Sequence, residues 1–272
     1  MYKIKDYRFS EYKVSPHLHK SNYAVLDGKS KQGIKYHPNF DFEHEFSVLR
    51  DLDHECIPKA YDFGKGTLFE NERFIINHYF IVLDHMSGID LVDYFKGKMA
   101  NNFLNQLDNI IKSFSSLCNP LDYLHSKDYI HCDIKPGHLM LDPETNTGYL
   151  IDFEFTIKKT GIIQGQSKGY VSPEHEAFVQ FLMSLPEDAS LETIEPDIAI
   201  ALDERSDIYS LGAVMYEVLT NKNWKESKIP PRDINDLIPK KLEDIIMATL
   251  EEDRSKRIST AKQLKQLLEN LI

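Results

Sequence analysis

The sequence predicts an α+β fold in two lobes, a small strand-rich lobe followed by a larger helical lobe. Up to about residue 90, short runs rich in Tyr, Val, Ile and Phe are bounded by turn-forming residues, as in strands. From Leu91 onward, apolar residues recur at steps of three and four, as in helices. The 272 residues, 42% of them hydrophobic, suffice for one large domain or for two lobes with their own cores. We place the boundary near Met86 to Gly88, which gives lobes at 1–86 and 87–272.

The first lobe is expected to contain strands and one short helix. Within "FDFEHEFSVLRDLDH", residues 40–54, four apolar residues from Phe42 to Leu52 recur at helical spacing and predict that helix. The strands are expected in four segments, at 21–28, 32–37, 57–64 and 79–85.

The second lobe is expected to be mainly helical. A long helix with one buried face is predicted from Phe103 to Leu124, because its apolar residues lie three or four positions apart. Two short apolar runs at 138–142 and 148–153 flank turn formers and predict a hairpin. An irregular loop is then expected at 156–174, followed by helices at 206–220, 241–253 and 259–272, the first of them buried on all sides.

Charge and composition exclude some classes of protein. A formal net charge of −11 disfavours nucleic acid or an anionic membrane as the main partner, because binding to either needs basic patches. No run of about 18 apolar residues marks a membrane span, and the amino terminus lacks the apolar stretch of a signal peptide. Cys56, Cys118 and Cys132 lack CxxC spacing and predict reduced thiols. The expected compartment is the cytoplasm, and the alternative is a secreted effector.

The stretch "YIHCDIKPGHLMLD", which starts at Tyr129, concentrates side chains that can perform chemistry. Taken alone, Asp133 and Lys135 would more often form a solvated surface pair. The two histidines and the cysteine of the stretch are residue types that bind zinc. No fourth ligand follows at a recognised spacing, so zinc is disfavoured. The stretch acquires a definite interpretation only from the motifs that follow it.

These motifs are "LIDFEF" at 150–155, "GYVSPE" at 169–174, "DERSDIYSLGAVMYEVLT" at 203–220 and Arg257 in "EEDRSKR". Together with the stretch above, they resemble the eukaryotic-like (Hanks-type) protein kinases, in the family's order and through nearly the whole chain. The resemblance implies a bilobal protein kinase-like fold. It also implies that Asp207 anchors the catalytic loop and that Arg257 pairs with Glu174.

The resemblance implies roles for side chains of the helical lobe. Asp133 would accept the hydroxyl proton, and Lys135 would neutralise the transferring phosphoryl group, a lysine typical of Ser/Thr-directed members. Asp152 would bind magnesium. His138 stands where the family has a second metal ligand, an Asn, and Ser167 stands where a Ser or Thr touches the catalytic Asp.

In the strand-rich lobe, the resemblance makes Lys35 the lysine that grips the α and β phosphates of ATP. Its ion-pair partner would be Glu45, with Glu43 as the alternative. The alternative that Lys35 is an ordinary lysine at a strand edge, with no functional role, also stays open.

The hinge that would meet adenine is expected in "LDHMSG". Leu83 would be the gatekeeper, and Asp84 to Met86 would offer backbone groups. The implied cofactors are ATP and magnesium, and the implied partners are ATP and an unidentified protein substrate.

Five features depart from the family pattern. His138 is a poor substitute for Asn on magnesium, so either one metal site is lost or a softer ion such as manganese is accepted. Cys132 replaces an arginine that pairs with an activation-loop phosphate in many members, so activity should not require that phosphorylation. Glu154 replaces a glycine, and 15–25 lacks the glycines that let backbone amides approach phosphates. The added length within 175–206 predicts a solvated helical pair or a docking surface for a partner.

Three functions follow as hypotheses. The first is an ATP-dependent protein kinase that acts on Ser or Thr. The second is a pseudokinase, a binding or allosteric module with little turnover. The third is another nucleotidyl or acyl-activating transfer on the same scaffold. The phrase "SDIYSLG" resembles bacterial members of the family most.

Overall fold

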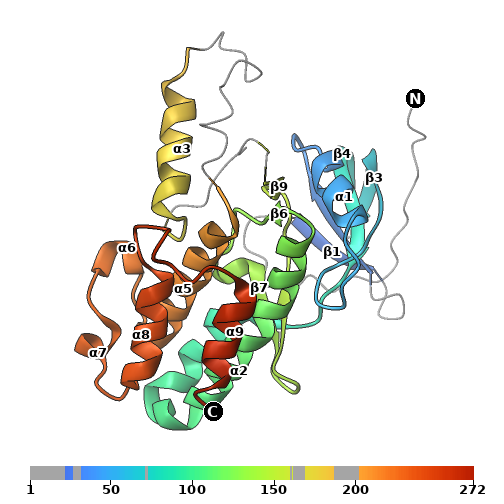
Figure 1. Ribbon diagram of the computed structural model, residues 1–272. Coiled ribbons are helices and arrows are strands. Elements are labelled where there is room, and N and C mark those ends of the chain that lie inside the picture. Colours follow the sequence, from blue (N-terminus) through green and yellow to red (C-terminus); the bar gives the residue numbers. More distant parts are fainter. Residues whose placement is uncertain (1–21, 27–31, 71–72, 160, 162–168, 187–201) are drawn as a thin grey trace.

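The computed structural model describes residues 22–26, 32–70, 73–159, 161, 169–186 and 202–272. These residues form two lobes, a twisted sheet with one helix and a larger helical body (Figure 1). The predicted architecture is therefore confirmed, and the predicted boundary falls between strand β4, which ends at Asp84, and helix α2, which begins at Leu91.

The strand-rich lobe is a four-stranded antiparallel sheet in the order β1-β2-β4-β3. Its strands are β1 (Asn22–Leu26), β2 (Gln32–His37), β3 (Ala60–Glu70) and β4 (Arg73–Asp84), and helix α1 (Glu43–Arg50) packs against it. Strands β3 and β4 are longer than the predicted segments because they pair from Ala60–Leu83 as far as Glu70–Arg73. Their outer halves carry charged and amide side chains, which obscure the strand pattern in the sequence.

The helical lobe is built around two long helices, α2 (Leu91–Ser126) and α5 (Glu204–Thr220). Helix α2 starts well before Phe103, because the Asp90 carboxylate accepts hydrogen bonds from the backbone N–H groups of Val92 and Asp93 and so caps the helix. Most of α5 is buried, as predicted. The remaining helices are α6 (Trp224–Ser227), α7 (Pro231–Ile234), α8 (Lys240–Thr249) and α9 (Ala261–Glu269).

Two small sheets lie where the lobes meet. The predicted hairpin is confirmed: β7 (Leu139–Asp142) pairs with β8 (Thr147–Leu150), and β5 (Ile89–Asp90) joins β7. The segment expected to be irregular contains a short strand, β9 (Ile157–Lys158), which pairs with β6 (Tyr129–Ile130). Helix α3 (Pro173–Ser184) follows and extends away from the helical body (Figure 1). The 3-10 turn η1 (Pro136–His138) precedes β7.

One continuous cluster of buried apolar side chains runs through both lobes. Phe42, directly before α1, and Leu49 of α1 belong to it, and so do Phe114 of α2 and Tyr209 of α5. A second cluster joins Cys132 to Ile157, Phe178 of α3 and other apolar side chains. Across the described parts of the chain, no helix has the length and apolar character that a membrane crossing requires.

Candidate active site

The catalytic loop predicted from "HCDIKPGH" follows β6, and a side chain of helix α5 holds its backbone in place. Asp207, 1% exposed, accepts hydrogen bonds from the backbone N–H groups of His131 at 2.8 Å and Cys132 at 3.0 Å. His125 Nε2 also lies 2.8 Å from the same carboxylate. The backbone of Cys132 has φ of 65°, a conformation that side chains disfavour. The bonds to Asp207 hold it there, and the predicted anchoring role is confirmed.

Asp133, the predicted base, is 3% exposed. Its Oδ2 atom accepts a hydrogen bond of 2.7 Å from Lys135 Nζ. Its Oδ1 atom is buried and has no hydrogen-bond partner among the described residues. A buried carboxylate oxygen without a donor is unfavourable by about 1–3 kcal/mol, so this atom is suited to receive a hydroxyl group from outside the chain.

His138 connects the catalytic loop to Asp152. Its Nδ1 atom donates to the backbone carbonyl of Asp133 at 2.9 Å, because a carbonyl can only accept. Burial lowers the pKa of His138 to about 4, so the ring is neutral near pH 7 and Nε2 carries a lone pair. That nitrogen lies 3.3 Å from Asp152 Oδ2. Two acceptors therefore face each other across this gap.

Lys35 of β2 lies at the centre of a cluster of carboxylates. Its Nζ atom is 2.9 Å from Glu45 of α1, 3.0 Å from Asp152 and 3.6 Å from Glu154. Burial by itself would lower the pKa of Lys35, but the three carboxylates outweigh burial and raise it, so the ammonium group is charged. Burial also acts to raise the pKa of Asp152, but Lys35 and the other positive neighbours together outweigh burial and lower it, so Asp152 is ionised.

Glu45 bridges the two lobes. One carboxylate oxygen pairs with Lys35, and the other accepts a hydrogen bond of 3.2 Å from the backbone N–H of Phe153. The Phe153 ring is fully buried, and its centroid lies 5.0 Å from that of His131. Asp152 has φ of 65°, which turns its carboxylate toward Lys35 and His138 while the following ring points into the core.

The pairing of Arg257 with Glu174 is also confirmed. The guanidinium group donates to both carboxylate oxygens, at 2.7 and 3.1 Å, and is itself inaccessible to solvent. The same carboxylate accepts a bond of 2.8 Å from Ser206 Oγ. This pair ties the start of α3 to the segment that follows α8.

Comparison with known families decides which fold this is. The model of the family described as "protein kinase domain" matches residues 29–272. The chain belongs to the protein kinase domain family. The expected kinase fold is therefore confirmed.

Curated relatives are bacterial serine/threonine-protein kinases. The probable serine/threonine-protein kinase PknB of Bifidobacterium longum is 28% identical over 240 residues, which cover 82% of this chain and 32% of that protein. PknB of Mycobacterium tuberculosis is 26% identical over 242 residues, with 82% and 34% covered. Serine/threonine-protein kinase D of Synechocystis is 28% identical over 240 residues, with 85% and 42% covered. The kinase domain thus spans about a third of the length of the first of these relatives.

The kinase structure brings together most of the residues singled out from the sequence: Lys35, Glu45, Asp133, Lys135, His138 and Asp152. Glu45 is the partner of Lys35, so the alternative partner Glu43, which is exposed, is not needed. Ser167, residues 15–21 of the glycine-free segment and residues 187–201 of the added segment lie outside the described residues.

The structure narrows which backbone group Asp84 of the predicted hinge can offer. The backbone N–H of Asp84 donates to the carbonyl of Lys59 at 2.9 Å, because β3 and β4 meet there. The Asp84 side chain accepts from Tyr61 Oη at 2.7 Å. Asp84 can therefore offer its backbone carbonyl oxygen to an adenine ring, but not its backbone N–H. Met86 stays a prediction as the donor.

Sequence reasoning missed two contacts in the kinase site. His125 supports Asp207, and its position in the last turn of α2 gave no signal because a lone histidine there is common. Glu154 was noticed only as a missing glycine, and its approach to Lys35 depends on how the two lobes meet.

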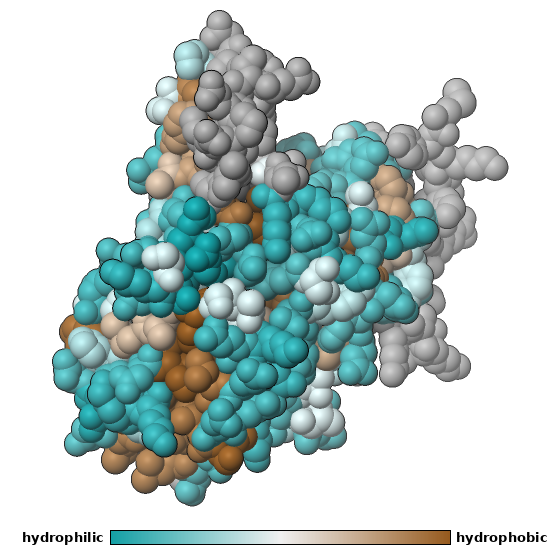
Figure 2. Space-filling view, in the orientation of Figure 1, coloured by the Kyte–Doolittle hydropathy of each residue, from teal (hydrophilic) through white to brown (hydrophobic). Residues whose placement is uncertain are grey.

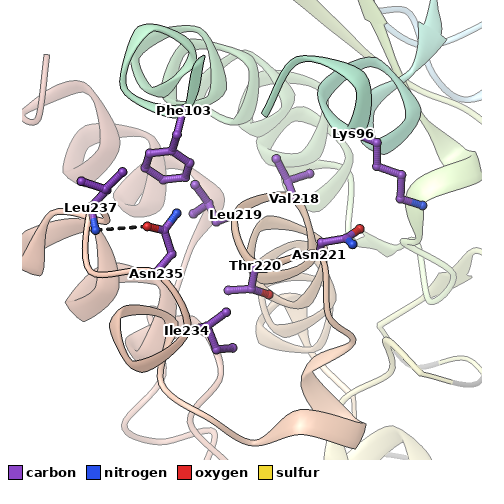
Figure 3. A pocket seen from close by; sticks show the side chains of 9 residues that line it. All are labelled: Lys96, Phe103, Val218, Leu219, Thr220, Asn221, Ile234, Asn235 and Leu237. Carbon is purple, nitrogen blue, oxygen red and sulfur yellow. Dashed lines mark hydrogen bonds between the residues drawn. The ribbon is translucent and has the colours of Figure 1, made fainter. Parts of the chain in front are cut away.

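A separate hollow lies at the base of the helical lobe, between α2, α5 and the α7–α8 connection, with a volume of about 670 Å³ (Figure 3). Its walls include Phe103, Leu219 and Leu237, and its polar members include Lys96 and Asn235. In the space-filling view, apolar side chains gather on this lower part of the molecule, whereas the strand-rich lobe is mostly hydrophilic (Figure 2). No residue of the catalytic centre lines the hollow, so it is not the nucleotide site.

Proposed function

We propose that the chain is an ATP-dependent protein kinase that transfers the γ-phosphate to Ser or Thr hydroxyl groups of a protein substrate. One observation carries the proposal: the Lys35–Glu45 ion pair is formed at 2.9 Å while Asp152 lies 3.0 Å from the same ammonium group. Phosphoryl transfer in protein kinases requires this ion pair and the metal-binding aspartate in place together.

The chain's own residues divide the work of the reaction. Asp133 Oδ1 accepts the proton of the attacking hydroxyl group, because it is the free acceptor of a carboxylate whose other oxygen is held by Lys135. Lys135 places a positive charge beside the transferring group. Lys35 binds the α and β phosphates, and Met86 and the carbonyl of Asp84 meet the adenine.

Asp152 and His138 would hold the divalent cation that the family uses. The fit rests on Asp152 Oδ2 and His138 Nε2, two acceptors that face each other at 3.3 Å. No group of three His, Cys, Asp or Glu side chains is arranged for a metal within the described ranges, which suits an ion that takes its other ligands from phosphate and water. When bound, the cation neutralises charge on the phosphates. We propose magnesium, or manganese because one ligand is a nitrogen.

Cys132 supports a further part of the proposal, independence from activation-loop phosphorylation. Its side chain is 3% exposed and packs among Ile157 and Phe178, in an apolar cluster that offers no charge to a phosphate. Ser167 as a contact of the catalytic Asp, partner docking on 175–206, the lobe boundary at Met86 and action in the cytoplasm stay proposals that rest on the sequence alone. The proposed partners include neither nucleic acid nor membrane, on the grounds of the net charge of −11.

One experiment distinguishes this proposal from the two alternatives, a pseudokinase and an enzyme that transfers the AMP part of ATP. The purified protein is incubated with ATP labelled at the γ or the α position, with magnesium or manganese, and with a generic basic protein as acceptor. The proposal predicts incorporation of the γ label, lost in Asp133→Asn and Asp152→Asn. Transfer of the α label alone would indicate AMP transfer. No transfer with either metal, and no rise of the unfolding temperature with ATP, would indicate a pseudokinase.

A further inference from the structure

Glu154 places a third carboxylate beside the phosphate-binding lysine. Its Oε2 atom lies 3.6 Å from Lys35 Nζ, which also contacts Glu45 and Asp152. The Glu154 side chain is 25% exposed, against 2% for Glu45 and 19% for Asp152. Glu154 is therefore the carboxylate of the three that an incoming anion can displace most readily from Lys35.

The charge of the centre is strongly negative as a result. Lys35 and Lys135 are its cations, and four carboxylates contact them: Glu45, Asp133, Asp152 and Glu154. The formal charges of these six side chains sum to −2, and a glycine at position 154 would leave −1. In a partly buried site, unit charges a few ångströms apart interact far more strongly than in water. A nucleoside triphosphate without a cation is repelled here, whereas a divalent cation is attracted.

We propose that Glu154 makes nucleotide binding conditional on a divalent cation: it occupies Lys35 in the free site and opposes phosphates that arrive without the metal. Once a cation has compensated the carboxylates, the phosphates exchange with Glu154 at the Lys35 ammonium group. This inference rests on the proposed nucleotide binding and adds an order to it, cation before or together with nucleotide.

The test is the coupling between cation and nucleotide, measured as binding and not as activity. Isothermal titration calorimetry gives the dissociation constant of the β,γ-imido analogue of ATP, first with a chelator present and then with saturating manganese, and again with magnesium. The variant Glu154→Gln keeps the shape of the side chain and removes its charge. Glu144→Gln is the matched control, because Glu144 lies in the turn between β7 and β8, where its backbone N–H bonds to Asp142.

We expect Glu154→Gln to bind the metal-free analogue on the order of tenfold more tightly than the wild type, with a change below about threefold when metal is present. The factor by which metal tightens binding then falls by several-fold in Glu154→Gln and is unchanged in Glu144→Gln. A purely structural role for Glu154 would not produce this pattern, because loss of structure weakens both affinities. The unfolding temperature without ligands reports whether the variant folds.

Two results would overturn the inference alone. One is that Glu154→Gln binds the analogue more tightly by the same factor with and without metal, which would make Glu154 a simple competitor of the phosphates for Lys35. The other is unchanged metal dependence in Glu154→Gln. Absence of analogue binding to the wild type under every condition would refute the proposed function, and this inference with it.

Discussion

At the scale of single residues, His138 shows how an imidazole can serve in place of an amide. An Asn side chain offers one donor and one acceptor, and the neutral His138 ring does the same with Nδ1–H toward the Asp133 carbonyl and Nε2 toward Asp152. In the proposed metal site, the donor contact would be preserved, and only the atom that would face the cation would change, from oxygen to nitrogen.

We therefore expect His138→Asn to raise phosphoryl transfer in magnesium, by about tenfold, since magnesium prefers oxygen ligands. In manganese, which accepts nitrogen more readily, the variant and the wild type should differ less. Initial rates with each metal at saturating ATP measure the effect. A lower rate of the variant in magnesium would show that the nitrogen ligand is not the limitation.

Residue spacing singled out Asp133, Lys135 and Asp152, because loops that perform the same chemistry keep the same residue types at fixed intervals, and the structure brings these loops together. Residue spacing could not predict how Glu154 approaches Lys35, since that contact joins two segments that are far apart in the sequence and belong to different lobes. Ser167 stays a prediction.

At the scale of secondary-structure elements, helix α5 positions the catalytic loop through one carboxylate. Burial would raise the pKa of Asp207, but hydrogen bonds from His125 and the loop backbone outweigh burial and lower it, so the group is charged. The backbone N–H groups of His131 and Cys132 both donate their hydrogen bonds to this carboxylate.

Asp207→Ala should lower the free energy of unfolding by about 3–5 kcal/mol, because it leaves both N–H groups buried without an acceptor. The matched control is Asp203→Ala, which removes the cap of the same helix together with the surface ion pairs of Asp203 with Arg205 and Arg254. It should lower the free energy of unfolding by about 1–2 kcal/mol. Urea denaturation gives both values, and hydrogen exchange at residues 131 and 132 should accelerate in Asp207→Ala alone. Equal effects of the two variants would contradict the anchoring role.

Apolar periodicity predicted helices α1, α5, α8 and α9, because their buried faces repeat at helical spacing. It placed the start of α2 too late, since the stretch "KGKMANN" at 96–102 interrupts the apolar pattern after Phe95, and the capping carboxylate of Asp90 was the signal for the true start. The outer halves of β3 and β4 were missed for a related reason: charged and amide residues interrupt their apolar runs, and the pairing of the two strands with each other leaves no mark in the sequence.

At the scale of the whole molecule, the Arg257–Glu174 pair connects distant parts of the helical lobe. Burial would raise the pKa of Glu174, but hydrogen bonds and charge from Arg257 outweigh burial and lower it below its ordinary 4.5. The folded state therefore binds a proton at this site less readily than the unfolded state. The stabilisation is present above the unfolded pKa and is lost as pH falls through the folded pKa.

Between about pH 5 and about pH 3, the wild type should therefore lose more free energy of unfolding than Glu174→Gln, which cannot titrate there. Urea denaturation at a series of pH values measures the difference, and parallel curves would contradict it. Arg257→Leu is the harsher change. It leaves Glu174 without its cation and should lower stability by about 3–5 kcal/mol at neutral pH.

Intact protein mass tests most directly whether this kinase domain transfers the γ-phosphate with Asp133 as base. Wild type and Asp133→Asn are first dephosphorylated, then incubated with ATP, magnesium or manganese, and a basic acceptor protein. We expect whole phosphoryl increments on the wild type or the acceptor, and none with Asp133→Asn. Increments that persist in Asp133→Asn, or their absence from the wild-type reaction with both metals, would contradict it.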